Sequence, residues 1–194
     1  MNFVILQLRN SNILLFFSVI SLFSTLAYAH FSLTGRFDLP LLIGDKAEAA
    51  FDLWSIQHFC AGILLGSVIL RSMPRPILPR EFILSIFLFA LFWEAAELAM
   101  ETGLFGMLIA DWKGGFEHWS NRFFGDPFMV IGGSLISIRI SYAWKIVLVP
   151  ASIWLLLNVF APTAMSIQNF LIHLFEESKS TLSDIPESPY NRRL

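Results

Sequence analysis

The chain has 194 residues, of which 56% are hydrophobic and only 14% charged, and its net charge is −2. A soluble domain has roughly a quarter of its residues charged, so this composition argues against a soluble protein and favours one that lies in a membrane. The small net charge and the lack of a clustered basic stripe give no sign of a nucleic-acid partner. The single cysteine, Cys60, excludes an internal disulfide and a cysteine metal cage.

Hydropathy predicts an all-α bundle of about five transmembrane helices over residues 1–162, because a bilayer core of about 30 Å needs roughly 20 helical residues. The fourth predicted span is short, which fits a tilted, re-entrant or extended segment. Residues 163–194 are predicted to form an amphipathic helix on the outer surface, followed by a disordered tail. The five predicted spans are Ile13–Phe31, Trp54–Leu70, Phe82–Leu104, Pro127–Ile140 and Ala143–Ala161.

The first span has a second interpretation. Arg9, an apolar stretch and the run Ala27-Tyr28-Ala29 have the layout of a signal peptide with a small-x-small cleavage site. The apolar stretch is long for a signal peptide, which favours an uncleaved helix. Cleavage would leave four spans and would not move the site described below.

Basic residues in the short links predict the orientation, because such residues stay on the cytoplasmic side. With these links inside, the amino terminus is cytoplasmic and the carboxyl terminus lies outside. The two long links, His30–Asp52 and Phe105–Asp126, then lie on the outer side. The basic residues of the short links are Arg71, Arg75, Arg80, Arg139 and Lys145.

Three carboxylates follow one stripe of the third span. Glu94, Glu97 and Glu101 are spaced i, i+3 and i+7, and Glu94 lies about 18 Å along the helix from Phe82. A charged residue inside a bilayer costs about 2.5–3.5 kcal/mol, so Glu94 should face the bundle and have a partner. Because neighbouring carboxylates repel, at least one should be protonated, hydrogen-bonded or metal-bound. A solvated helix end would explain Glu101 better than Glu94.

The second span begins with two ionisable groups, Asp52 and His58. His58 is followed by Gly62 and Gly66 at four-residue steps, and a GxxxG face lets a neighbouring helix come close. Any helix that packs there should meet His58. A packing face with a hydrogen-bonded histidine is the alternative to a functional role.

The second long link contains Glu117-His118-Trp119-Ser120-Asn121-Arg122 and ends at Asp126-Pro127. An Asp before a Pro is also typical of a helix start, with Asp as the cap. Arg122 is expected to pair with a carboxylate or to hold an anionic headgroup. Gly132 and Gly133 again permit close helix approach.

Together these groups predict a polar site in the outer half of the bundle. We expect a divalent metal on His58, Glu94 and Glu97, with His118 or Asp126 as a further ligand, since imidazole and carboxylate suit zinc, iron or manganese. The sequence has neither an H-E-x-x-H motif nor the E-x-x-H of bundle di-iron sites. Catalytic roles are predicted for Glu94, Glu97 and Asp126, and substrate contacts for Arg122, Asn121 and Trp93.

The order Trp54-Ser55-x-x-His58-Phe59-x-x-Gly62, then Trp93-Glu94-x-x-Glu97, then Asn121 and Asp126 with Gly133 beyond, resembles small bacterial inner-membrane proteins of the VanZ-like and YjdF-like kind. The resemblance covers about Phe51 to Ile136, and Pro127 departs from the pattern. It implies a bacterial inner-membrane location, and the orientation predicted from the basic residues then places the carboxyl terminus in the periplasm. These families are largely uncharacterised, with one branch linked to glycopeptide-antibiotic tolerance, so the resemblance supports the site more than any reaction.

Two functions fit these observations. The first is an enzyme that uses a metal-activated water against a lipid or envelope-precursor bond. The second is a non-catalytic accessory, assembly or transport subunit of a larger membrane complex, in which the polar groups brace the bundle. Ion conduction fits less well, because the acidic groups stop near the midplane. Membrane lipids are the expected partners in every case.

Overall fold

The computed structural model describes residues 2–73 and 77–160. Within them the chain is mostly helical, and the predicted amphipathic helix and tail over residues 163–194 lie outside the described residues. The elements in chain order are α1 (Asn2–Thr34), β1 (Leu41–Ile43), β2 (Ala49–Phe51), α2 (Trp54–Ser72), α3 (Pro79–Glu101), α4 (Met107–Lys113), the π-helical turn η1 (Asn121–Gly125), α5 (Asp126–Arg139) and α6 (Ala143–Phe160).

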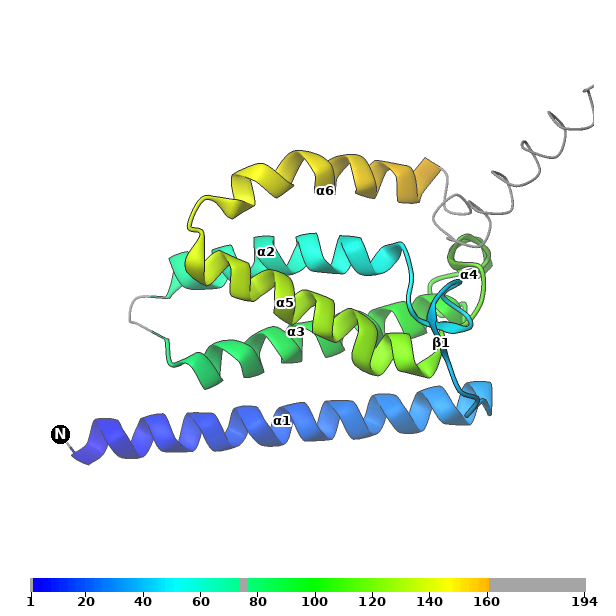
Figure 1. Ribbon diagram of the computed structural model, residues 1–194. Helices are drawn as coiled ribbons and strands as arrows, with labels where there is room; N and C mark the ends of the chain where they lie inside the picture. Colours follow the sequence, from blue (N-terminus) through cyan, green and yellow to red (C-terminus); the bar gives the residue numbers. More distant parts are fainter. Residues whose placement is uncertain (1, 74–76, 161–194) are drawn as a thin grey trace, which may run out of the picture.

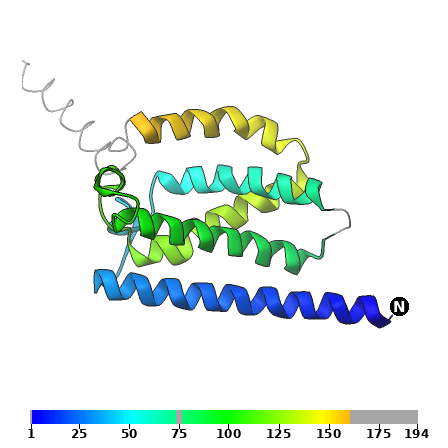
Figure 2. The same cartoon turned by 180° about the vertical axis from the view of Figure 1, so that it is seen from behind.

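The long helices run side by side, with α1 along one side of the bundle and α6 along the other (Figures 1 and 2). Helices α2, α3 and α5 lie between them. The helices alternate in direction, so α1 and α3 end where α2 and α5 begin. We call this end, which also carries the strands and α4, the polar end of the bundle.

Three of the described helices are long and apolar enough to cross a membrane: Ile13–Thr34 within α1, Trp54–Ser72 and Pro79–Glu101. They correspond to the first three predicted spans. The fourth and fifth predicted spans are also helices, but α5 has only 14 residues and the apolar part of α6, Ala143–Leu156, is shorter than a full span. Five transmembrane helices are therefore not confirmed.

The two long links contain structure that the all-α prediction left out. Strands β1 and β2 form a parallel pair with Leu41 opposite Ala49, and β2 leads directly into Asp52 and α2. The second link contains α4 and η1. The two links are joined where the His118 amide donates to the Lys46 carbonyl at 2.7 Å. Together they cover the polar end.

Helix α2 packs tightly against α5 through the small residues that the sequence singled out. A side chain added at Gly62 would overlap the Val130 carbonyl, and one added at Gly133 would overlap the Phe59 carbonyl. Such close backbone contact is open only to glycine at these two positions. The GxxxG prediction is therefore confirmed, and α5 is the helix that meets His58.

This contact predicts a clear difference between two neighbouring glycines. Gly133→Ala should lower the free energy of unfolding by about 1–3 kcal/mol, because the added methyl group overpacks the contact. Gly132→Ala is the matched control, since its nearest neighbour is the Phe59 ring at 3.8 Å. Denaturant unfolding of both variants in detergent would measure the difference. Equal stabilities would contradict this account of the α2–α5 contact.

Two apolar clusters hold α1, α2, α3 and α5 together. One joins α1 to α3 and η1, and the other joins α2, α3 and α5. Helix α3 contributes to both, so its carboxylates are held at a fixed place between the other helices. The buried members are Val19, Leu26, Leu91, Leu98 and Phe123 in the first cluster, and Ile69, Phe82, Ile86, Ala90 and Val130 in the second.

Candidate metal centre

Four side chains from three helices meet at the polar end. His58, Glu94, Glu97 and Asp126 are all buried, and each offers one ligand atom within 4.8 Å of the others. Ligand atoms bound to zinc at about 2.0–2.2 Å in a tetrahedron are about 3.3–3.6 Å apart. The most widely separated ligand atoms of the group would therefore move together by up to about 1.5 Å when they bind one ion.

The helices place these side chains by their periodicity and by the glycine contact. Glu94 and Glu97 lie one turn apart on the same face of α3, which the two apolar clusters turn inward. His58 lies in the second turn of α2, next to the close contact with α5. Asp126 is the first residue of α5 and directly follows η1. A π-helical turn is rare and is frequently found at functional sites.

Asp126 is held from outside the group by Ser55. The Ser55 hydroxyl lies 3.0 Å from Asp126 Oδ1, and the Ser55 amide donates to Asp52 Oδ1 at 3.0 Å. The other oxygen of Asp126 lies 3.1 Å from His58 Nε2. The start of α5 has no side-chain capping hydrogen bond, although Pro127 does lie in its first turn. The Asp126 carboxylate thus faces the group rather than capping its helix.

Glu94 is the member of the group whose side-chain oxygens have the fewest polar partners. Its side chain is fully buried, and neither carboxylate oxygen has a hydrogen-bond partner among the described residues. The nearest cation is Arg122, whose Nε lies 3.8 Å from Oε2. Leaving a buried acceptor unsatisfied costs about 1–3 kcal/mol, and more for a charged group. A proton or a bound cation would satisfy such a carboxylate.

Glu97 has a strong partner in Lys113, the last residue of α4. The Lys113 Nζ lies 2.7 Å from Glu97 Oε1, and both side chains are buried. The ammonium also lies over the Trp54 ring, 4.9 Å from its centroid. Burial lowers the pKa of Lys113, but the charges of Glu97 and Glu117 outweigh this and raise it above its ordinary value. Lys113 therefore stays charged and holds α4 over the site.

Arg122 is the centre of a second set of contacts behind the four groups. Its fully buried guanidinium donates to Glu101 Oε2 at 2.8 Å and to Glu117 Oε2 at 3.2 Å. Its Nη1 lies 3.1 Å from His30 Nδ1 at the end of α1. Of the two roles expected for Arg122, the structure shows the pairing with carboxylates.

The polar end has more acidic groups than cations. Six buried carboxyl groups lie there, against three cationic side chains that pair with them among the described residues. Burial raises the pKa of Glu117 to about 8, against the lowering effect of Arg122, and raises the pKa of Asp52 to about 6. Such a surplus is relieved by protons or by a bound cation. The carboxyl groups are Asp52, Glu94, Glu97, Glu101, Glu117 and Asp126, and the cations are Lys46, Lys113 and Arg122.

The other predicted site residues lie around the group. His118 is not among the four: its Nδ1 lies 2.7 Å from the Ser120 hydroxyl, and its Nε2 is 3.7 Å from Asp38 Oδ1. Asn121 is fully buried and donates to Glu117 Oε1 at 2.9 Å. Trp93 lines a pocket next to His58 and Glu97.

Three side chains that contact the buried charged groups of the polar end do not stand out in the sequence: His30, Lys46 and Lys113. In the sequence His30 is the end of an apolar run, and the two lysines lie in links that have no repeating pattern. The excess of acidic residues was the available signal, because buried carboxylates require nearby cations. Which cations supply them depends on how the two links fold over the polar end.

No protein-family model matches this chain, and no curated protein or solved structure matches it. The resemblance to VanZ-like proteins therefore stays a prediction from the sequence.

Proposed function

We propose that the protein is a membrane metalloenzyme that cleaves or transfers a polar group of a lipid or envelope precursor. His58, Glu94, Glu97 and Asp126 would hold a divalent cation at the outer face of the bacterial inner membrane. The observation that carries the proposal is Glu94, a fully buried carboxylate that has no hydrogen-bond partner among the described residues. One of its oxygens lies within 4.8 Å of an atom from each of three other side chains that could bind a metal.

The chemistry of the four groups fits this role. One imidazole and three carboxylates suit zinc, manganese or iron, and such an ion activates water and polarises a phosphoryl or carbonyl oxygen. The Ser55 hydroxyl orients Asp126, as a second layer of hydrogen bonds does in known metal sites. A carboxylate of the group that binds the ion through one oxygen would act as general base with its other oxygen.

A non-catalytic role is the second candidate, and the Arg122 contacts favour it. Arg122 joins α1, α3 and the link before α5 through His30, Glu101 and Glu117. In a small accessory or assembly subunit, these contacts would fix the bundle without any reaction. This role predicts that the four-residue group binds no ion.

Metal content separates the two candidates. Wild-type protein, purified in detergent and incubated with zinc, manganese or iron(II), should retain about one ion per chain, as measured by mass spectrometry of the elements. His58→Gln should lose the ion because the nitrogen ligand is removed. Glu81→Gln is the control, since Glu81 is a buried carboxylate of the same helix about 20 Å away from Glu94.

Wild-type protein without a retained ion under all three conditions would overturn the metalloenzyme proposal. Equal retention by wild type and His58→Gln would place the ion elsewhere. If the ion is retained as expected, release of a water-soluble head group from membrane lipids by wild type but not by His58→Gln would test the reaction itself.

A further inference from the structure

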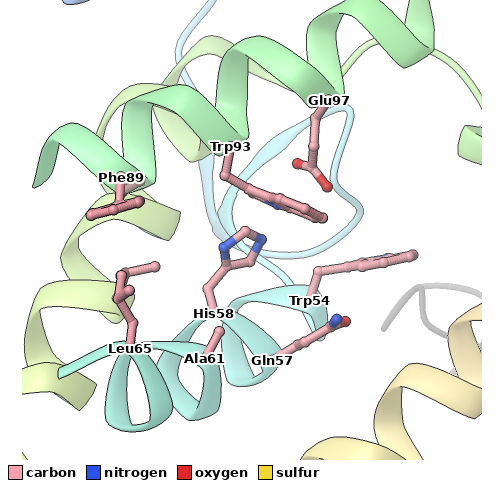
Figure 3. A pocket seen from close by; sticks show the side chains of 10 residues that line it. Trp54, Gln57, His58, Ala61, Leu65, Phe89, Trp93 and Glu97 are labelled. Carbon is pink, nitrogen blue, oxygen red and sulfur yellow. The ribbon is translucent and has the colours of Figure 1, made fainter. Parts of the chain in front are cut away.

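A pocket of about 280 Å³ lies between α2 and α3 and reaches the candidate metal centre (Figure 3). Its walls are apolar over most of their length. His58 and Glu97 close one end, and both side chains point into the space between the two helices. The apolar part of the lining includes Ala61, Leu65, Phe89 and Trp93.

The pocket has one polar end and one apolar end, and it extends along the axes of α2 and α3. On α2 its lining runs from Trp54 to Leu65, about 16 Å along the helix axis away from the polar end. On α3 it runs from Glu97 back to Phe89, again away from the polar end. An occupant would therefore keep its polar part at the metal centre and its apolar part toward the middle of the bundle. A lipid in the outer leaflet has this arrangement.

The pocket is also accessible from the side of the bundle. Phe89 is 54% exposed and Trp93 49% exposed, although both line the pocket. Both walls belong to helices that are long and apolar enough to span a membrane. In a bilayer this opening would face hydrocarbon, so the molecules that can enter are lipids.

The volume limits what fits. Pockets for drug-sized ligands are roughly 300–1,000 Å³, so this pocket is too small for a two-chain lipid. We propose that it binds one hydrocarbon chain of a membrane lipid and brings the polar part of that lipid to His58 and Glu97. The inference rests on the proposed function, because it assigns the apolar part of the substrate.

Ala61 provides a variant that fills the pocket without disturbing the core. It lines the pocket yet is exposed, so a larger side chain displaces no packed neighbour. Ala61→Phe should therefore fold and should exclude the chain. Ala99→Phe is the matched control, because Ala99 lines an apolar pocket of about 260 Å³ between α1 and α3 whose lining includes no member of the four-residue group.

The test uses protein in phosphatidylcholine vesicles that contain a small fraction of phosphatidylglycerol with a photoreactive diazirine in one acyl chain. After irradiation, peptide mapping of wild type should show labelling at residues 61–65 and 89–93 that excess unlabelled phosphatidylglycerol abolishes. Ala61→Phe should lose this saturable labelling, and Ala99→Phe should keep it. Labelling that no competitor reduces, or that persists in Ala61→Phe, would overturn the inference.

Metal content, measured on the same samples, separates this inference from the proposed function. Ala61→Phe should retain the ion while losing the chain. Saturable labelling in wild type that retains no ion would support the chain pocket and reject the metalloenzyme. Retention of the ion without saturable labelling would reject the chain pocket and leave the metal centre standing.

Discussion

Arg122→Met should destabilise the protein by about 3–5 kcal/mol, the cost of removing one partner from a buried ion pair. The guanidinium is fully buried and donates to both Glu101 and Glu117. Methionine fills a similar space but leaves these two carboxyl groups without their cation. Denaturant unfolding in detergent would measure the change.

Two further variants test whether the loss of stability comes from the buried ion pairs of Arg122. Arg122→Lys keeps the charge but not the forked geometry that reaches both carboxyl groups, so its stability should lie between those of wild type and Arg122→Met. Arg71→Met is the control: Arg71 is exposed, donates to the Ser141 carbonyl and lies over the Trp144 ring. It should change stability by about 1 kcal/mol or less. A similarly small effect for Arg122→Met would contradict the bracing role.

The sequence was sufficient to place the long helices and to single out His58, Glu94, Glu97 and Asp126, which the structure brings together. Long apolar runs marked the helices, and the i, i+3 spacing on α3 put Glu94 and Glu97 on one face. The cost of a carboxylate in an apolar span then required that face to point inward. The GxxxG run beside His58 required a close neighbour, which the structure identifies as α5.

The conformation of the two long links does not follow from hydropathy or from residue spacing. The direction of a side chain in a link depends on tertiary contacts rather than on a repeating pattern, so His118 was predicted as a ligand but contacts Ser120 and Asp38. For the same reason Lys113 was not recognised as the partner of Glu97. The β1–β2 pair has only three residues in each strand, too few for alternation to be visible.

Glu94→Gln tests most directly whether the group is a metal centre or a brace. The change keeps the size of the side chain and removes a carboxylate that has no hydrogen-bond partner among the described residues. The metal-free variant should therefore be at least as stable as metal-free wild type. Wild type should gain about 2.7 kcal/mol of stability when the ion is present at 100 times its Kd, and the variant should gain none.

Glu101→Gln is the matched comparison on the same helix, seven residues further along. Glu101 pairs with Arg122 at 2.8 Å and with Lys46 at 3.4 Å and does not belong to the four-residue group. Its substitution should cost about 1–3 kcal/mol without metal but preserve the gain when metal is added. Without metal, Glu94→Gln should thus be at least as stable as wild type, and Glu101→Gln should be less stable. A residue whose replacement does not lower stability is typical of a site where stability has been given up for function. If Glu94→Gln instead destabilises the metal-free protein and wild type gains nothing from metal, the four groups brace the bundle and bind no ion.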